Sequence, residues 1–371
     1  MRYGFIFVAL AIFISFNTYV IMRGWQALPS ASVLRPVYLI SFITLFLMLL
    51  GTMIFGNAMP QPVAKVVSFI GFTYFIVVIY LFLSFALVDV VRIANHFIHF
   101  APDGMQVFRL WAMVATLAVT GIALVWGNYR FNHPQIVTLN LTSDKPLQHK
   151  KLKIVAASDI HLGISIDKKD LQGYVKMIND QHPDIVLLAG DISDRSIVPL
   201  IRQNMAEEFR TIKAPLGVYA INGNHDLLAE TQNATAEYLK TAGIKVLRDE
   251  VSLVDSSFYV VGRDDRTNHN RKKLSEIVNG LDKNKMMILL DHQPFHLEEA
   301  EQNNIDLQIS GHTHDGQFFP GHYFVGRIFE KGYGYLRKGK TQYYVSSGLG
   351  IWGPQYRIGT QSELVVINLS Y

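Results

Sequence analysis

Hydrophobic residues are concentrated in four long runs in the first third of the chain. These runs are Tyr3 to Met22, Val37 to Phe55, Val66 to Val88 and Leu110 to Trp126, and they are nearly free of charged residues. Because roughly 20 apolar residues cross a bilayer as a helix, the pattern predicts four transmembrane helices. A cleaved signal peptide is the alternative for the first run, but no small-residue cleavage site follows it and three further runs do. We therefore expect a membrane region over residues 1–131.

The pattern changes after about Asn132, where short strand-like stretches replace the long apolar runs. Ile136 to Leu141 alternates between apolar and polar residues, as a half-buried strand does. Strands and helical stripes then alternate as far as Ile221, and the later strands follow one another with few helices between them. This density of strands predicts an α/β domain over residues 132–371, with two packed sheets flanked by helices in an αββα arrangement.

Polar residues follow five of the predicted strands at the point where each strand ends. They occur in Ser158-Asp159-Ile160-His161, Gly190-Asp191, Gly223-Asn224-His225-Asp226, His292 and Gly311-His312-Thr313-His314. Ligands of open α/β sheets bind at the carboxyl ends of the strands, so these segments can converge along one edge. Carboxylates, imidazoles and an amide oxygen suit divalent metals such as Mn, Fe, Zn or Mg. A single histidine of this kind is more often a plain loop residue, but the ordered set predicts a metal site.

Charged residues are distributed unevenly along the chain. Residues 1–130 contain seven Lys or Arg and two Asp or Glu, whereas the remainder contains 27 and 28. The second region is therefore nearly neutral, and no basic patch indicates a nucleic acid as a partner. The chain contains no cysteine, which excludes a disulfide framework and any thiolate metal site.

The order of the polar segments resembles that of a known enzyme family. Asp-x-His, Gly-Asp-x-x-Asp, Gly-Asn-His-Asp, His and Gly-His-x-His follow one another as in the calcineurin-like metallophosphoesterases, from about Leu152 to the C-terminus. The stretches Gly311 to Gln317 and Ser346 to Gly350 are most similar to those of a membrane-associated or exported bacterial subgroup. The resemblance implies two divalent metal ions, with Mn, Fe or Zn as the candidates. It assigns Asp159, His161, Asp191 and His314 to one ion and Asp191, Asn224, His292 and His312 to the other, with Asp191 bridging them.

The resemblance also implies roles for residues that bind no metal. His225 matches the family's proton donor, and Asp194 matches the carboxylate that orients it. Arg195 matches an arginine that contacts phosphate in some members. Asp226 has two alternative roles, which are orienting His225 and capping the helix that follows.

The chain departs from the subgroup at two positions near the predicted site. Asp315 stands where glycine is usual and adds a carboxylate beside the site. Ser347 stands where arginine is common, so a phosphate contact there is in doubt. Trp352, Tyr356 and Arg357 lie in a glycine-rich loop that either grips a lipid headgroup or merely anchors the loop.

Together these features predict a membrane-anchored, metal-dependent phosphohydrolase that cleaves a phosphoester or phosphodiester with a hydroxide activated by two metals. Four spans exceed what an anchor needs, so a lipid or envelope phosphate is a candidate substrate beside a phosphorylated small molecule. The alternative is a non-catalytic membrane sensor or scaffold that binds a phosphorylated ligand, but none of the predicted metal ligands is missing. Asp89 and Arg92, at the end of the third run, form either an interfacial ion pair or a transport or lipid-headgroup site.

These spans predict a multi-pass membrane protein with the lipid bilayer as its partner, and the resemblance to the bacterial subgroup implies a bacterial cell membrane. The Lys and Arg residues that flank the runs are balanced between the two sides, so they do not decide the orientation. The basic cluster of Lys150, Lys151 and Lys153 favours the cytoplasmic side for the chain ends and the catalytic domain.

Overall fold

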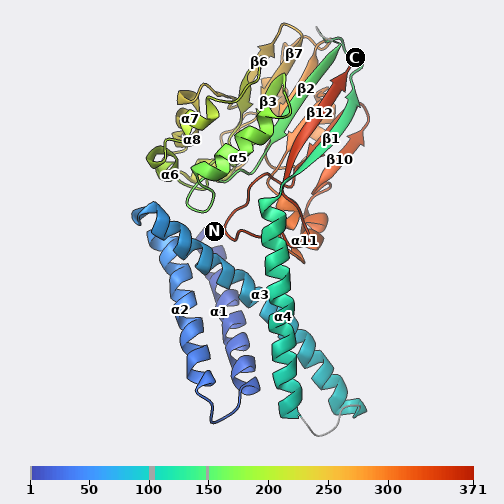
Figure 1. Ribbon diagram of the computed structural model, residues 1–371. Coiled ribbons are helices and arrows are strands. Elements are labelled where there is room, and N and C mark those ends of the chain that lie inside the picture. The colour runs from blue at the N-terminus through green and yellow to red at the C-terminus, as the bar shows by residue number, and fades with distance from the viewer. Residues whose placement is uncertain (1, 100–104, 148–149) are drawn as a thin grey trace. The chain divides into compact units, whose positions relative to one another are not determined.

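A computed structural model describes residues 2–99, 105–147 and 150–371 (Figure 1). The chain divides into two compact units. The first contains Met1–Trp126 and Gly353–Gln355, and the second contains Gly127–Trp352 and Tyr356–Tyr371. The boundary falls inside one helix, so the last residues of that helix belong to the second unit.

Helices make up most of the described part of residues 1–126 in the first unit. Its elements are α1 (Arg2–Ala27), α2 (Leu34–Phe55), the 3-10 turn η1 (Gly56–Ala58), α3 (Gln61–Ile98) and α4 (Met105–Asn132). Pro62 lies in the first turn of α3, where its missing N–H costs little because the first amides of a helix have no intrahelical partner. The helix ends at His99, which adopts the left-handed conformation with φ 52°.

Three helices are long and apolar enough to cross a membrane, among the residues that the structure describes. They are Leu34–Ala58, Gln61–Ile98 and Val107–Asn132. The structure therefore supports three of the four predicted spans. The first predicted span, Tyr3 to Met22, lies on α1, and the side chains of residues 2–6 and 9 lie outside the described part. The described rest of α1 carries the polar residues Asn17, Arg23 and Gln26.

Aromatic rings and one glycine pack the first three helices together. Phe16 of α1 stacks on Phe82 of α3, with ring centroids 3.8 Å apart. Gly71 lets α3 approach α2 closely, because a Cβ at this position would lie 2.8 Å from the Cα atom of Leu49. These contacts give the first unit an apolar interior of its own.

Asp89 on α3 connects this helix to α1. Its carboxylate accepts a hydrogen bond from Tyr19 Oη at 2.6 Å and one from Arg92 Nη1 at 2.8 Å. Arg23 Nη2 lies 2.5 Å from the same carboxylate. Asp89 and Arg92 therefore form an ion pair, which was part of one of the two alternatives for these residues. Arg23 of α1 is a second arginine beside the same carboxylate.

The second unit contains two six-stranded sheets within its described residues (Figure 1). The first sheet has the order β1 (Gln135–Thr142), β12 (Glu363–Ser370), β2 (Lys151–Ala157), β3 (Ile185–Leu188), β4 (Val218–Ala220) and β5 (Lys245–Val246). The second has the order β10 (Gly334–Lys338), β11 (Thr341–Val345), β9 (Leu307–Ser310), β8 (Met286–Leu290), β7 (Phe258–Gly262) and β6 (Glu250–Val254). The parallel runs β2-β3-β4 and β7-β8-β9-β11 bring their carboxyl ends to a common edge of each sheet.

Short helices connect the strands. They are α5 (Lys168–Asn179), α6 (Val198–Arg202), α7 (Ala206–Phe209), η2 (Asp226–Leu228), α8 (Ala234–Thr241), α9 (Leu274–Ile277), α10 (Glu298–Gln302), η3 (His314–Gly316) and α11 (Gly321–Ile328). α5 begins where the carboxylate of Asp167 accepts the backbone N–H groups of Lys169 and Asp170. Its buried stripe of Leu171 and Ile178 faces the first sheet, which α5 crosses in Figure 1.

Alternate residues of the central strands enter different apolar layers. Ile154 and Leu187 lie between the two sheets together with Ile288 of the second sheet. Their neighbours Val155 and Leu188 pack on the opposite face, in the layer that contains α5. A further apolar layer, which includes residues of α9 and α10, covers the outer face of the second sheet. The predicted α/β fold with two sheets between helical layers is confirmed.

Candidate metal centre

The loops that follow the parallel strands are held together by their backbones. The N–H of Asp159, after β2, donates to the carbonyl of Gly190, after β3, at 3.0 Å. The N–H of Gly311, after β9, donates to the carbonyl of His292, after β8, at 2.9 Å. Loops that are far apart in sequence are thereby joined, and the side chains that they carry are brought to one place.

Predicted metal ligands occupy a rare backbone conformation. Positive φ angles are found at Asp159 (53°), His161 (51°), Asp191 (51°), His312 (72°) and His314 (50°). A non-glycine residue in this region costs about 1–3 kcal/mol and is kept where the surrounding structure demands it, often at functional sites. The strain sets the direction of each side chain just after its strand.

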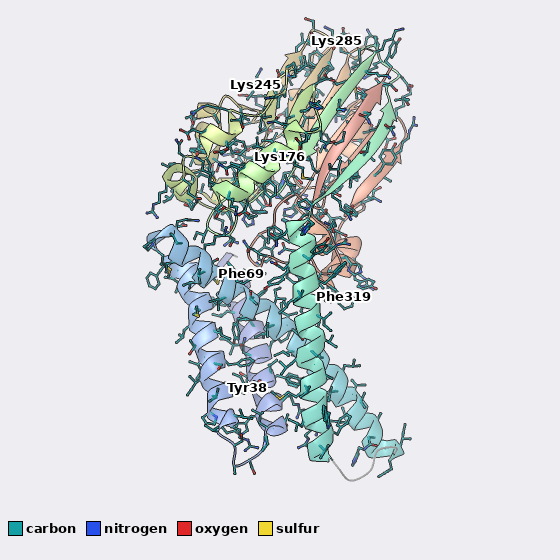
Figure 2. The ribbon with its side chains drawn as sticks, in the orientation of Figure 1. Tyr38, Phe69, Lys176, Lys245, Lys285 and Phe319 are labelled. Atoms are coloured by element: carbon teal, nitrogen blue, oxygen red, sulfur yellow. The ribbon has the colours of Figure 1, made fainter. Side chains whose placement is uncertain are left out.

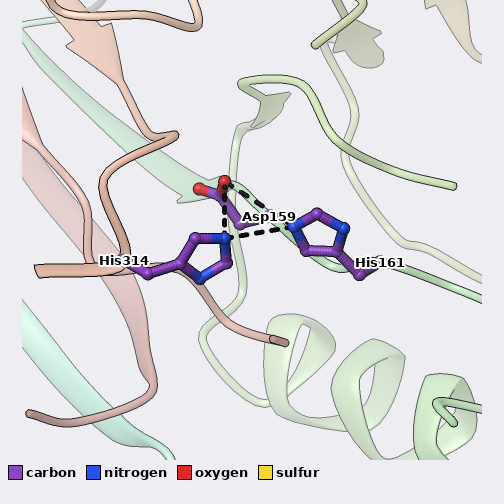
Figure 3. A group of neighbouring side chains, drawn as sticks. All are labelled: Asp159, His161 and His314. Atoms are coloured by element: carbon purple, nitrogen blue, oxygen red, sulfur yellow. Dashed lines mark hydrogen bonds and ion pairs between the residues drawn. The ribbon is translucent and has the colours of Figure 1, made fainter. Parts of the chain in front are cut away.

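One group of side chains consists of Asp159, His161 and His314, all of them buried (Figure 3). The Nε2 atoms of His161 and His314 are 3.1 Å apart. His314 Nε2 lies 3.3 Å from Asp159 Oδ1, and His161 Nε2 lies 4.0 Å from the same oxygen. Two imidazole nitrogens and a carboxylate oxygen therefore point at one small volume.

A second group consists of Asp191, His292 and His312. His292 donates from Nδ1 to the carbonyl of Ala189 at 2.8 Å, which directs Nε2 at Asp191 Oδ2, 3.2 Å away. Asp191 Oδ2 also lies 3.7 Å from His161 Nε2 of the first group. The carboxylate of Asp191 therefore lies between the two groups.

Asn224 lies beside the second group. Its neighbour His225 donates its backbone N–H to Asp191 Oδ1 at 2.8 Å. The side-chain oxygen of Asn224 is buried and has no hydrogen-bond partner among the described residues. A buried acceptor of this kind needs a donor or a cation, because its desolvation is otherwise uncompensated.

The electrostatics of the two groups fit bound cations. Burial lowers the pKa of His292, but the carboxylate of Asp191 outweighs it and raises this pKa well above its ordinary value. Burial, followed by the charge of His161, lowers the pKa of His314 well below its ordinary value. A proton and a metal compete for the same nitrogen, so the carboxylates that attract a proton to His292 would equally hold a divalent ion. Nε2 of His292 is buried and directed at this carboxylate, which also fits a metal ligand.

His225 and Asp194 form a pair beside the first group, and Asp194 Oδ1 also lies 3.8 Å from His161 Nδ1. Nδ1 of His225 lies 2.8 Å from Asp194 Oδ1. Burial lowers the pKa of His225, but the charge of Asp191 and the hydrogen bond to Asp194 raise it above its ordinary value overall. Arg195 is exposed, and its positive charge acts on His225 in the opposite direction. The structure thus brings all ten predicted site residues into one region, and their individual roles stay predictions.

The sequence of the second unit matches known proteins. The family model of the calcineurin-like phosphoesterases matches residues 152–316. An uncharacterized metallophosphoesterase of Campylobacter jejuni is 30% identical over 268 residues, which cover 68% of this chain and 68% of that protein. The chain belongs to the calcineurin-like metallophosphoesterase family. Members of this family use divalent metal ions to hydrolyse phosphoesters, and the chain is accordingly a metallophosphoesterase.

Two further relatives are named as metallophosphoesterases or as proteins with that domain. A "transmembrane protein with metallophosphoesterase domain" from Danio rerio is 31% identical over 282 residues, covering 69% of this chain and 62% of that protein. The chain therefore spans less than two thirds of the zebrafish protein's length. An uncharacterized metallophosphoesterase of Helicobacter pylori is 27% identical over 370 residues, covering 98% of this chain and 97% of that protein. The similarity to the Helicobacter protein thus includes the apolar helices.

Asp226 has neither of the roles that its place in the metallophosphoesterase motif suggested. Its carboxylate accepts N–H groups from Ile192 at 3.1 Å, Ser193 at 2.8 Å and Gly223 at 2.8 Å. His225 is oriented by Asp194 instead. Asp226 therefore ties the loop after β3 to the loop after β4, and burial, followed by the charge of Asp191, raises its pKa to about 6.

Arg357 is a supporting residue of the metallophosphoesterase site whose role the sequence left open. It is 0% exposed, so it cannot grip a lipid headgroup. Its guanidinium donates to the carbonyl of His314 at 2.9 Å, of Gly350 at 2.6 Å and of Gly348 at 3.1 Å. The anchoring alternative is therefore correct for Arg357, and the glycine-rich loop around it was the only sequence signal.

The two departures from the bacterial subgroup have different consequences. Ser347 is buried and donates its hydroxyl to the carbonyl of Gln361 at 2.6 Å, so it is part of the loop framework. Asp315 is half-buried directly after His314, and burial raises the pKa of its carboxyl. It adds an acidic group next to a predicted metal ligand.

Proposed function

We propose that this protein hydrolyses a phosphomonoester or phosphodiester at a pair of divalent cations, with Mn, Fe or Zn as the candidates. The observation that carries the proposal is the position of Asp191, whose Oδ2 lies 3.2 Å from His292 Nε2 and 3.7 Å from His161 Nε2. A carboxylate between two groups of imidazoles suits a bridging ligand. Asp159, His161, Asp191 and His314 would hold one ion, and Asp191, Asn224, His292 and His312 would hold the other.

Bound at these residues, two cations supply charge for the phosphoryl oxygens and lower the pKa of water, so that a nucleophile forms near neutral pH. The protein's own contribution begins with His225. Its Nδ1 is engaged by Asp194, so Nε2 is the nitrogen that can give a proton to the leaving oxygen. The bond between phosphorus and this oxygen breaks as the oxygen of water bonds to phosphorus. The products are a phosphate and an alcohol, and the proton released by water restores His225.

Arg195 supplies an exposed positive charge near this histidine. It is exposed, has φ 63° and follows Asp194 directly. A guanidinium suits two non-bridging oxygens of a phosphate better than a lysine does, because its N–H groups form a rigid fork. We assign Arg195 to substrate binding on this basis.

The substrate is a phosphorylated small molecule or lipid, and the partner of the first unit is the bilayer. Three helices capable of spanning a membrane and the likeness to a protein named as transmembrane support a multi-pass membrane protein. The likeness to the Helicobacter pylori protein over 98% of this chain supports a bacterial cell membrane. The cluster of Lys150, Lys151 and Lys153 supports a cytoplasmic position for the catalytic unit. A reporter fused to Tyr371 tests this side directly, and periplasmic activity of the reporter would refute it.

Hydrolysis and metal content test the proposal together. The purified full chain should contain about two divalent ions for each protein, as other enzymes with paired catalytic cations do, and it should release nitrophenol from soluble nitrophenyl phosphate esters. Asp191→Asn should lose both metal and activity, since this carboxylate lies between the two groups. A chain that binds two ions but hydrolyses neither a monoester nor a diester would support the sensor or scaffold alternative instead.

A further inference from the structure

Helix α11 exposes large apolar side chains next to the metal centre. None of the residues of α11, all of which are described, is buried. Tyr323, Phe324 and Ile328 are 57%, 60% and 62% exposed, and Phe319, labelled in Figure 2, lies two residues before the helix and is 45% exposed. Contiguous exposed apolar residues of this size in a folded domain mark an interaction surface.

The exposed residues share one side of α11. At about 100° per residue, Tyr323, Phe324, Arg327 and Ile328 fall within an arc of about 140°. Arg327 is exposed in the last turn of the helix, and Lys331 follows the helix. Aromatic and aliphatic side chains with adjoining basic residues are typical of a helix that lies in a membrane interface.

Contacts connect α11 to the metal centre within the second unit. The helix packs against the turn η3, which begins at the predicted ligand His314. The hydroxyl of Thr313 donates to the carbonyl of Gly332 at 2.6 Å, which joins the two ends of the segment containing α11. The ring of Phe329, the residue after the helix, lies 6.1 Å from the ring of His312. α11 therefore borders the predicted ligands His312 and His314.

Hydrogen bonds also connect the start of this segment to the end of a membrane-spanning helix. The last residues of α4, from Gly127 to Asn132, belong to the second unit and close the candidate span Val107–Asn132. The N–H of Arg357 donates to the carbonyl of Gly127 at 2.9 Å. The N–H of Phe319 in turn donates to the carbonyl of Ile358 at 2.7 Å. Two successive residues, Arg357 and Ile358, thus link the end of the span to the residues before α11.

We propose that α11 inserts Phe324 and Ile328 into the membrane interface and that the metal centre beside it acts on phosphate groups of membrane amphiphiles. This inference rests on the proposed hydrolase function and names its substrate class. The bilayer is the occupant of the exposed face because the same segment is fastened to the end of a candidate span. A phosphate at the headgroup level would then reach the metal centre beside α11 without the lipid leaving the membrane.

Insertion is measured without reference to catalysis. Because the chain contains no cysteine, Phe324→Cys creates a single site for an environment-sensitive dye. Leu253→Cys is the matched control, since Leu253 is 48% exposed on β6 at the edge of the second sheet. In full chains reconstituted into phosphatidylcholine vesicles, the dye at residue 324 should emit as in an apolar environment and the dye at 253 as in water. Equal, water-like emission at both residues overturns the insertion of α11.

The substrate class is measured by competition. Metal-loaded wild-type chain in vesicles should hydrolyse a soluble nitrophenyl ester, and phosphatidic acid in the vesicles should inhibit this reaction at a concentration roughly tenfold below that of glycerol phosphate. The double variant Phe324→Ser and Ile328→Ser should lose this preference, whereas Leu253→Ser should keep it. A preference that persists in the double variant overturns the assignment of lipid substrates to α11. Absence of any ester hydrolysis in the wild type would instead refute the proposed hydrolase function, and the dye measurement would still judge α11.

Discussion

Nδ1 of His225 lies 2.8 Å from Oδ1 of Asp194, although the two residues follow different strands of the first sheet. The carboxylate holds the proton on Nδ1 and fixes the plane of the ring. The opposite nitrogen is consequently the one available to a substrate. The acid-base chemistry of the site therefore depends on a pair of residues that bind no metal in our assignment.

Replacing His225 by alanine should slow catalysis without removing metal. General acids contribute about 10²–10⁴-fold, so kcat for an alkyl phosphate ester should fall by this factor in His225→Ala. The loss should be smaller for a nitrophenyl ester, because its leaving group needs little protonation. Steady-state kinetics with both esters and metal analysis check the prediction. Full retention of the rate on the alkyl ester would show that another group donates the proton.

Asp194→Asn should impair the same step through the ring of His225. An amide can donate to Nδ1 and thereby favour the wrong tautomer, so kcat should fall roughly 10–10²-fold while the metal content stays the same. The double variant Asp194→Asn and His225→Ala should be no slower than His225→Ala alone, since Asp194 acts through the histidine. Independent, multiplying effects of the two substitutions would contradict this coupling.

Acid should weaken the folded protein through the histidine at position 312. Burial, followed by the charge of His292, lowers the pKa of His312 to about 4, against an ordinary value of 6.5. Between pH 6.5 and about 4 the unfolded chain therefore binds a proton here that the folded chain does not, and the free energy of unfolding falls as the pH falls through this window. Thermal unfolding of the metal-free chain at about pH 7.5 and about pH 5 checks it. The stability of His312→Gln should decrease less between these two pH values than the stability of the wild type. An equal decrease in both proteins would show that His312 does not cause the loss of stability in acid.

Arg357→Met should destabilise the catalytic unit and weaken metal binding. The substitution leaves the carbonyls of His314, Gly348 and Gly350 without the guanidinium that now donates to them. Loss of a buried charged donor with several partners costs about 2–5 kcal/mol in unfolding free energy. Chemical unfolding and metal titration measure both effects. Arg337→Met is the control, because Arg337 is exposed and should change stability by no more than about 0.5 kcal/mol.

Gly223→Ala should expel the metals because of a steric conflict. A Cβ at residue 223 would collide with the carboxylate and the backbone N–H of Asp191. Metal content and activity should both fall in Gly223→Ala. Gly173→Ala lies inside α5 with nothing within 4 Å of the added carbon among the described residues, and it should stabilise the protein by about 0.5–1 kcal/mol. Normal metal content in Gly223→Ala would show that the loop can move aside.

The sequence by itself was sufficient to predict the α/β core and the candidate ligands. Four central strands, β2, β3, β8 and β9, are mostly apolar runs followed by polar residues. The local composition of such a run is enough to predict that the strand is buried. The ordered set of Asp159, His161, Asp191, His292 and His314 was informative for the same reason, because each lies directly after such a run. Edge strands such as β6 and β10 were not predicted, since their exposed residues lack this local signal.

Only the tertiary structure decided how the surrounding residues are used. Asp226 binds backbone N–H groups of the loop after β3, Arg357 supports the loop of His314, and Phe319 bonds to a residue beside the end of α4. Each of these contacts joins segments that are distant along the chain, and the identity of a residue does not reveal its long-range partner. The exposed apolar side of α11 could not be predicted from the sequence for a similar reason. An apolar residue is expected to be buried, and only the fold shows that these side chains are exposed. Residue patterns thus specify which elements form, whereas the packing of those elements specifies which side chains meet.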